Sequence, residues 1–201
     1  MNNLASLLYG KGKHKEAESL YYKTLEIEKR ILGTEHPLTV ASMKNIVSLF
    51  SDGAKYEETE PLFRKVLEKE ENILGPEHPS TLTTKQNFAV FLRNKSNYPE
   101  KSIPLLEEIL IVRRKQNNQG DLSSILTALG TTYGKCNLFD EAVNTLEESI
   151  NIRRKLLKNG YLSKEPLIAS LKRLLDIYEK IGKEKEIEET QAEIKSLLDY
   201  L

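Results

Sequence analysis

The chain has 201 residues with 30 basic and 30 acidic side chains, so its formal net charge at pH 7 is zero. Balanced charge argues against nucleic-acid binding by bulk electrostatics, because that mode of binding needs an excess of Lys and Arg. The apolar runs are only a few residues long, whereas a membrane-spanning helix needs about 20. No signal peptide is recognisable ahead of the first helical segment, so we expect a cytoplasmic protein that binds neither membranes nor nucleic acids.

A six-residue pattern, Leu-Gly-x-Glu-His-Pro, occurs at Leu32–Pro37 and again at Leu74–Pro79, an offset of 42 residues. An Asn followed by an apolar residue recurs at the same offset, as Asn3-Leu4, Asn45-Ile46 and Asn87-Phe88. Less regular copies centred on Leu129 and Leu174 bring the number of copies to five. A repeat of this length is typical of stacked helical arrays, in which each repeat buries its apolar face against its neighbours.

Within each copy the apolar residues recur at helical spacing, so each copy should form a pair of α-helices. Pro37, Pro79 and Pro166 suit the first position of a helix, where the missing N–H would be unpaired anyway. Gly33 and Gly75 suit the position that closes the preceding helix. In chain order, we predict helices at residues 2–11, 14–32, 38–52, 56–74, 79–95, 98–117, 121–136, 139–158, 165–181 and 184–199, with no strand.

Pro104 lies several residues inside the predicted helix at residues 98–117. A proline in a helix interior removes a main-chain hydrogen bond and clashes with the preceding turn, at a cost of about 3 kcal/mol. We therefore predict that this helix is bent or starts late. Pro99 falls in the first turn and should be tolerated.

The repeated pattern is part of a longer motif. This motif begins with Asn-Leu-Ala, continues with an aromatic residue or His, and includes a Glu-rich segment after a turn. Its clearest copies are Asn3-Leu4-Ala5, His14–Leu20, Tyr56–Leu62 and Phe139–Ala142. On these residues the chain resembles the tetratricopeptide repeat family, in the 42-residue form found in kinesin light chains and nephrocystin-like proteins. The match is specific over residues 2–95, fair over 121–158, and reduced to spacing and apolar periodicity in the fifth copy.

The resemblance implies an all-α fold, a right-handed α-solenoid of about five helix pairs. It also implies a single array over residues 1–201, with units at approximately 1–37, 38–79, 80–120, 121–162 and 163–201. The small residue that lets the paired helices approach is Ala17 or Ala142, but Thr59 and Lys101 take its place in the second and third units. Because the third unit has also lost the Leu-Gly-x-Glu-His-Pro pattern, we expect its packing to be the loosest.

In this family the concave surface formed by the first helix of each pair holds extended peptides. The resemblance implies that an Asn just before the first core Leu, with basic residues near it, contacts the peptide. An amide suits this role because it donates and accepts hydrogen bonds at once. The predicted groove residues are Asn3, Lys44, Asn45, Ser48, Gln86, Asn87, Arg93, Lys172 and Arg173. The alternative is that these are ordinary solvated side chains.

Nothing in the sequence indicates a catalytic site, a cofactor or a metal. His36 and His78 occupy equivalent places one repeat apart, which favours a capping or packing role over metal binding. The basic clusters Arg113–Lys115 and Arg153–Lys155 should lie near the ends of second helices, where cations suit the helix dipole. Phosphate binding by these clusters is the less favoured alternative.

The predicted function is a non-catalytic scaffold that binds an extended peptide or a partner helix. One alternative is a regulatory repeat segment of a larger enzyme or signalling NTPase, because Met1 begins within a unit. A second alternative is an RNA-binding solenoid, which the neutral charge disfavours. The first helix should also expose Leu4, Leu7 and Leu8, which would favour end-to-end self-association.

Overall fold

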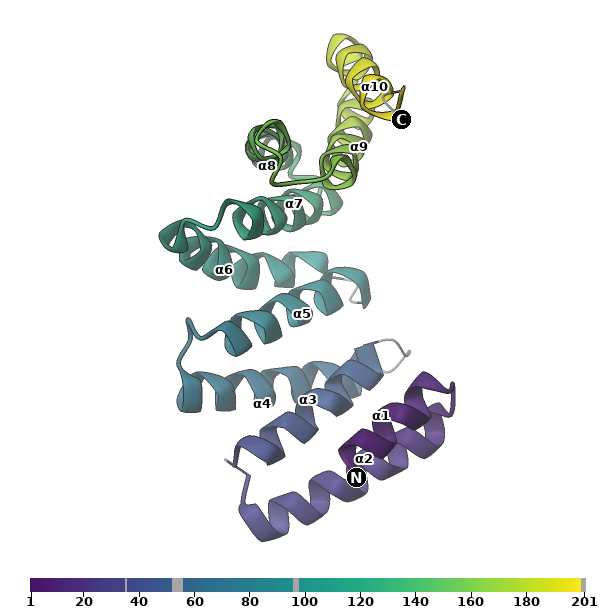
Figure 1. The fold of residues 1–201 in the computed structure, drawn as a ribbon, viewed down its shortest axis with the longest axis vertical. Coiled ribbons are helices and arrows are strands. Elements are labelled where there is room, and N and C mark those ends of the chain that lie inside the picture. Colours follow the sequence, from purple (N-terminus) through teal and green to yellow (C-terminus); the bar gives the residue numbers. More distant parts are fainter. Residues whose placement is uncertain (35, 52–55, 96–97, 200–201) are drawn as a thin grey trace. The chain divides into compact units, whose positions relative to one another are not determined.

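The computed structural model describes residues 1–34, 36–51, 56–95 and 98–199. Within these ranges the chain forms ten α-helices, one short 3-10 helix and no strand (Figure 1). The prediction of ten helices in an all-α fold is therefore confirmed. The chain divides into a first unit, residues 1–97, and a second unit, residues 98–201. That the two units form one array stays a prediction.

The first unit contains five helices, which are α1 (Asn2–Gly10), α2 (His14–Leu32), α3 (Pro37–Ser51), α4 (Tyr56–Leu74) and α5 (Pro79–Lys95). Each helix packs against the next one, and α1 also contacts α3. The first helices of these two repeats therefore lie next to one another. In the core, the rings of Phe63 and Phe88 are stacked with their centroids 4.8 Å apart and their planes 13° apart, an arrangement that adds to the effect of burial.

The second unit contains a 3-10 helix and five α-helices, which are η1 (Pro99–Ser102), α6 (Ile103–Gln116), α7 (Gln119–Lys135), α8 (Phe139–Lys158), α9 (Lys164–Ile181) and α10 (Glu184–Asp199). Consecutive α-helices again pack together, and α7 also contacts α9. The approach of α7 to α8 is close, since a Cβ at Gly130 would lie 2.7 Å from Leu146 Cγ. Glycine at this position is therefore required by packing.

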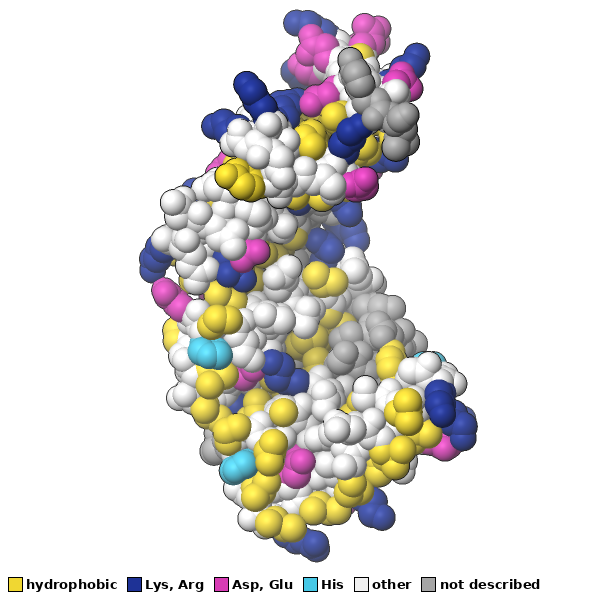
Figure 2. Space-filling view, viewed as in Figure 1, with side chains coloured by type: hydrophobic (Ala, Val, Ile, Leu, Met, Phe, Trp, Pro, Cys, Tyr) yellow, Lys and Arg dark blue, Asp and Glu magenta, His cyan; other side chains and the backbone are white. Residues whose placement is uncertain are grey.

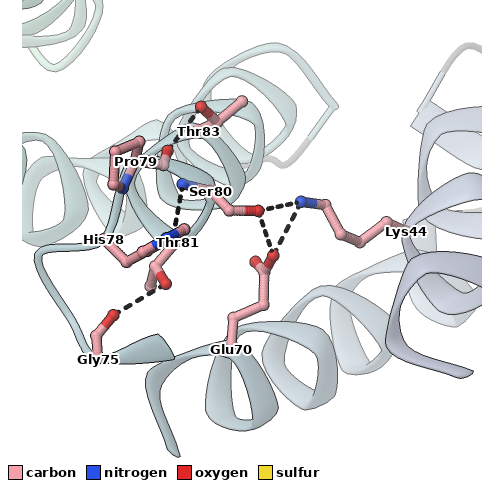
Figure 3. A network of polar contacts seen from close by, with 8 residues as sticks. All are labelled: Lys44, Glu70, Gly75, His78, Pro79, Ser80, Thr81 and Thr83. Atoms are coloured by element: carbon pink, nitrogen blue, oxygen red, sulfur yellow. Dashed lines mark hydrogen bonds and ion pairs between the residues drawn. The ribbon is translucent and has the colours of Figure 1, made fainter. Parts of the chain in front are cut away.

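The repeated Leu-Gly-x-Glu-His-Pro pattern forms the connection between repeats. Gly75 adopts a φ of 91°, which glycine allows without strain. His78 Nδ1 accepts the N–H of Ser80 at 3.1 Å, and the Thr81 hydroxyl donates to the Gly75 carbonyl at 2.9 Å (Figure 3). The earlier copy has the same contacts, from Leu38 N–H to His36 Nδ1 (3.2 Å) and from Thr39 Oγ1 to Gly33 O (2.8 Å). The capping role predicted for both histidines is confirmed.

The prediction of a late helix start at Pro104 is also confirmed. Residues 99–102 form the 3-10 helix η1, and α6 begins only at Ile103, which places Pro104 in its first turn. The prediction that Lys101 takes the small position is wrong. The 3-10 turn shifts the register by one residue, so that Ser102 is fully buried while Lys101 is exposed, its Nζ 5.3 Å from the centre of the Tyr98 ring. The looser packing expected of the third repeat involves α5 and α6, which belong to different units, and stays a prediction.

Candidate functional site

The predicted groove residues that the structure describes lie on first helices of repeats. Those with exposed side chains are Asn3 on α1, Asn87 on α5, and Lys172 and Arg173 on α9. Those with half-buried side chains are Lys44 and Asn45 on α3, and Gln86 and Arg93 on α5. The side chain of Ser48 lies outside the described part of the chain. Six of these residues therefore belong to the first unit, and Lys172 and Arg173 belong to the second.

Lys44 is the centre of a polar network that joins three helices of the first unit. Its Nζ donates to Glu70 Oε1 on α4 at 2.8 Å and to Ser80 Oγ on α5 at 2.9 Å. The Ser80 hydroxyl donates to the same Glu70 oxygen at 2.8 Å, which closes the triangle seen in Figure 3. The ammonium group of Lys44 is thus held by a neighbouring repeat in addition to its own.

The carboxylate in this network is almost completely buried, with 3% of the Glu70 side chain exposed. Burial raises the pKa of this carboxyl, but hydrogen bonds from Lys44 and Ser80, the charge of Lys44 and the nearby Thr84 hydroxyl outweigh it and hold the pKa below its ordinary value. The Thr84 hydroxyl acts without a hydrogen bond of good geometry, because neither Thr84 Oγ1 nor Glu70 Oε2 has a hydrogen-bond partner among the described residues. Glu70 is therefore ionised at neutral pH.

Beside this network lies a cavity of about 160 Å³ between α3, α4 and the start of α5. Its lining is Pro37, Val40, Ala41, Lys44, Glu70, Ile73, Leu74 and Ser80. Ile73 and Leu74 are 41% and 42% exposed, so part of the apolar wall is open to solvent. A dry cavity of about 150 Å³ holds a group the size of benzene. The cavity, with its apolar wall and its Lys44–Glu70 edge, is thus large enough for one apolar side chain.

Figure 2 shows hydrophobic side chains gathered over the surface of the first unit. The exposed ones include Ile31, Leu32, Leu38, Ile73 and Leu74, near the connections between repeats, Leu4 and Leu7 on the first helix, and Met1 just before it. Leu8 is half-buried. The predicted partial exposure of this first-helix face is therefore confirmed for Leu4, Leu7 and Leu8.

A larger cavity, of about 330 Å³, lies in the second unit between α8, α9 and α10. Its charged groups are largely paired, because Arg154 bonds both oxygens of Glu193 at 2.9 and 2.6 Å. The Tyr178 hydroxyl donates to Glu147 Oε1 at 2.7 Å, and burial together with this carboxylate raises the pKa of Tyr178. We find no nucleophile and base in contact here, and no grouping of three or more metal-binding side chains anywhere in the described ranges.

None of the described helices is long and apolar enough to cross a membrane.

Two sequence profiles described as tetratricopeptide repeat match the chain, one over residues 1–58 and the other over residues 39–80 and 122–160. Together they cover more than half of its length. The chain belongs to the tetratricopeptide repeat family. Repeats of this family serve in general as protein-interaction scaffolds, and the polar network and apolar cavity of the first unit lie within the matched residues.

Solved structures of tetratricopeptide repeat arrays share this fold. Nearly identical TPR-like repeats from a candidate kinesin light chain of Podosopora anserina give a TM-score of 0.83 at 22% identity, covering 98% of this chain and 92% of that one. BtubC (BKLC) from P. vanneervenii gives 0.81 at 20% identity, covering 98% and 77%. The fold is therefore that of kinesin-light-chain-like repeat arrays.

A nucleotide-binding leucine-rich repeat (NLR)-like protein of Hyaloscypha variabilis is 42% identical over 43 residues. The matched segment is 21% of this chain and 4% of that protein, so the tetratricopeptide repeat chain corresponds to a small part of this relative's length.

Sequence reasoning missed Glu70 as the partner of Lys44, although a signal was present. Charged residues recur at the repeat offset within the apolar face of the second helices, as Glu28, Glu70 and Arg153. The basic clusters lie near the ends of α6 and α8 as expected, with Arg113, Arg114, Lys115 and Lys155 in the last turns. The burial of Arg153, which is 7% exposed, was not expected. A charge at a core position indicates either a buried partner or a bound ligand.

Proposed function

We propose that this tetratricopeptide repeat chain is a non-catalytic scaffold that binds an extended peptide along its first helices. The observation that carries the proposal is the cavity of about 160 Å³ beside the Lys44–Glu70 network, on the helix that also carries Asn45. An apolar side chain of the peptide would enter this cavity. Burying such a side chain contributes about 1.5–3 kcal/mol, which gives the ligand an anchor.

Asn45 and Asn87 would hold the backbone of that peptide. They are one repeat apart on α3 and α5, and the first is half-buried while the second is exposed. An amide can donate to a peptide carbonyl and accept from a peptide N–H, so it binds the backbone without demanding a particular sequence. The lining of the cavity then supplies the preference for one apolar side chain.

The proposal is tested with a peptide that is selected from a random library for its binding to the wild-type chain. Replacing Asn45 and Asn87 together by Ala should weaken its affinity by about 1–3 kcal/mol, because buried amide contacts are lost. Fluorescence anisotropy of the labelled peptide gives the affinity, and thermal unfolding checks that the fold is intact. Asn72→Ala, at an exposed position on the second helix α4, is the control. Equal affinity for wild type and the double variant would exclude these two residues from the site.

Ala41→Trp tests the cavity separately, because a large side chain at its lining should fill it. We expect a similar loss of peptide affinity with little loss of stability, since Ala41 is exposed. Unchanged affinity would place the anchor elsewhere.

A second candidate function is that of a regulatory segment in a larger signalling protein. The short match to an NLR-like protein, which covers 4% of that relative, favours it. Sequencing the full-length transcript discriminates the two, because an adjoining nucleotide-binding domain would support the regulatory function. The only feature that favours RNA binding, in contrast, is the fold itself, an array of helical repeats. Retention on RNA that falls steeply with salt would be needed to support it.

A further inference from the structure

The cavity of about 330 Å³ in the second unit has an apolar floor and a charged rim. Its floor is formed by Ile150, Leu171 and Leu174, all of which are buried. Lysine and arginine side chains bury their aliphatic stems along apolar surface and keep the charged group at a polar edge. The rim carries four carboxylates and one cation, which are Glu147, Glu186, Glu189, Glu193 and Arg154. The lining therefore has a surplus of negative charge above an apolar floor.

The walls of the cavity are two second helices, α8 and α10, and their charged residues match in register. Glu147 precedes Arg154 by two helical turns on α8, and Glu186 precedes Glu193 by two turns on α10. At the later position the walls are complementary, because Arg154 bonds both oxygens of Glu193 at 2.9 and 2.6 Å. At the earlier position both walls carry a carboxylate. The cavity thus has one end that is neutral and one that is acidic.

The two carboxylates of the acidic end act on the same hydroxyl group. Tyr178 on α9 is 7% exposed, and its hydroxyl donates to Glu147 Oε1 at 2.7 Å. Burial raises the pKa of Tyr178 most, and the hydrogen bond to Glu147 and the charges of Glu147 and Glu186 raise it further. Carboxylates from two different helices therefore lie close to one buried hydroxyl at this end.

Within the described ranges, no cation that lines the cavity is available to these two carboxylates. Glu147 forms no ion pair there, and Glu186 forms only a long one, of 3.9 Å, with Lys183, which does not line the cavity. The guanidinium of Arg154 is held by Glu193 and by Asn151 Oδ1, the latter at 3.0 Å. Because like charges repel, a cation from another molecule would be favoured between Glu147 and Glu186.

We propose that this cavity binds a lysine or arginine side chain of a partner protein, with the stem on the apolar floor and the cationic group between Glu147 and Glu186. Hydrogen bonds from such a group to carboxylates are among the stronger ones in proteins. Ligand cavities span roughly 300–1,000 Å³, so the volume suits one long side chain. The site goes beyond the proposed function, because it lies in the second unit and none of the predicted groove residues lines it.

The first experiment uses capped single amino acids as probes. N-acetyl-lysine methylamide and N-acetyl-arginine methylamide are compared with N-acetyl-norleucine methylamide, which has an aliphatic stem and no charge. Backbone amide signals of Leu174, Tyr178 and Thr190 are followed by NMR at constant ionic strength. We expect saturable shifts, and several-fold tighter binding of a cationic probe than of the norleucine probe. Equal binding of all three probes, or shifts that do not saturate, would overturn the proposal.

The second experiment removes the charge of the acidic end. Glu147→Gln and Glu186→Gln keep the size of the side chains, and the Gln carbonyl oxygen can still accept the Tyr178 hydroxyl. Together they should weaken binding of the cationic probe by about ten-fold or more, because hydrogen bonds to charged groups are lost. Glu188→Gln is the matched control, since Glu188 is exposed on α10 and does not line the cavity.

An equal loss of affinity in the Glu188→Gln control would show a general effect of charge and overturn the proposal, as would wild-type affinity in the double variant. Circular dichroism and thermal unfolding check the fold of each variant. Should the double variant fail to fold, Glu186→Gln alone leaves the bond between Tyr178 and Glu147 in place. It should still weaken binding of the cationic probe several-fold, and wild-type affinity would overturn the proposal.

The third experiment tests for a protein ligand. Peptides from a random library are selected on the wild-type chain and counter-selected on the double variant at Glu147 and Glu186. We expect the recovered peptides to share a Lys or Arg, whose replacement by norleucine lowers affinity by about ten-fold. Recovered peptides without a shared basic residue would overturn the proposal.

The variant in which both Asn45 and Asn87 are replaced by Ala separates this site from the proposed function. Peptides that bind at the cavity of the second unit should have the same affinity for this variant as for the wild-type chain. If every selected peptide depends on Asn45 and Asn87 and none on Glu147 and Glu186, the cation site is wrong and the scaffold function stands. The reverse result supports the cation site and contradicts the proposed peptide site of the first unit.

Discussion

The imidazole of His78 acts as a helix N-cap, because its Nδ1 accepts the N–H of Ser80 at the start of α5. Ser, Thr, Asp and Asn are the usual residues in this role. An imidazole accepts at Nδ1 only when that nitrogen carries no proton. The same hydrogen bond recurs at His36, so an imidazole acceptor at the start of the first helix is a feature of the repeat.

Replacing His78 by Ala should lower the free energy of unfolding by about 0.5–2 kcal/mol, because the N–H of Ser80 loses its acceptor. His78→Asn should restore most of this stability, since the Asn side chain can accept the same N–H. Urea denaturation followed by circular dichroism measures both variants. If the Ala and Asn variants are equally stable, the hydrogen bond to His78 Nδ1 does not cap α5.

Because of Glu70, the free energy of unfolding of the chain should depend on pH in the acid range. Since its folded-state pKa is lowered, its contribution is fully present above the ordinary value of 4.5 and is lost as pH falls through the folded value. Glu70→Gln should cost about 1–3 kcal/mol at pH 7, because hydrogen bonds to a charged group are weakened.

The difference between wild type and Glu70→Gln should shrink below pH 4.5. Urea denaturation at a series of pH values measures it, with Glu57→Gln, at an exposed position of the same helix, as the control. A difference that is constant from pH 7 to pH 3 would show that the charge of Glu70 does not contribute.

The contacts of Glu70 could not be predicted from the residue identities alone. The sequence places Lys44 on a first helix by its repeat position, and that position is correct. Its partner Glu70 lies 26 residues away on a different helix, and only the packing of α3 on α4 brings the two together. The burial of Arg153 was missed for the same reason, because it depends on the neighbouring α7 and α9.

At the scale of elements, helix boundaries followed well from local signals. Proline restricts the backbone angles and glycine widens their range, and both effects are local. Pro79 therefore marks the start of a helix and Gly75 the end of one, whatever the rest of the chain does. The late start of α6 followed from Pro104 in the same way. The register of η1 could not be predicted in this way. Ser102 is buried in place of Lys101 because of a 3-10 turn, and no residue pattern predicts that turn.

The close packing of α7 against α8 should make Gly130 sensitive to any side chain. Alanine is the better helix former by about 1 kcal/mol, yet its Cβ would lie 2.7 Å from Leu146 Cγ and 3.2 Å from the carbonyl oxygen of Ala142. We expect Gly130→Ala to lower the free energy of unfolding by about 1–3 kcal/mol, the usual cost of overpacking.

Thermal and urea unfolding measure this variant, and Gly10→Ala is the control, because no atom lies within 4 Å of a Cβ at that position. The control should be neutral or slightly stabilising. A stabilising effect at Gly130 as well would mean that α7 and α8 can separate without cost.

At the scale of the whole molecule, the repeat offset was the most informative property of the sequence. An offset of 41 to 45 residues separates successive copies from Ile46 to Leu174, so the weak local signals near Leu174 gain support from the strong ones near Ile46. The charge balance is also a property of the whole chain. Basic and acidic side chains are interspersed on the face shown in Figure 2.

This balance should control solubility. With a net charge of zero at pH 7 and a pI near 6.9, electrostatic repulsion between molecules is weakest around neutral pH. We therefore expect solubility, measured as the polyethylene glycol concentration that precipitates the protein, to be lowest near pH 7 and to rise on either side. Lys183→Glu should move the minimum to lower pH, because it changes the net charge by two units at an exposed position that forms only a long ion pair, of 3.9 Å, with Glu186. Lys183→Arg keeps the charge and should leave the minimum in place. If both variants precipitate as the wild type does, exposed apolar side chains such as Leu4 and Ile31, and not net charge, set the solubility.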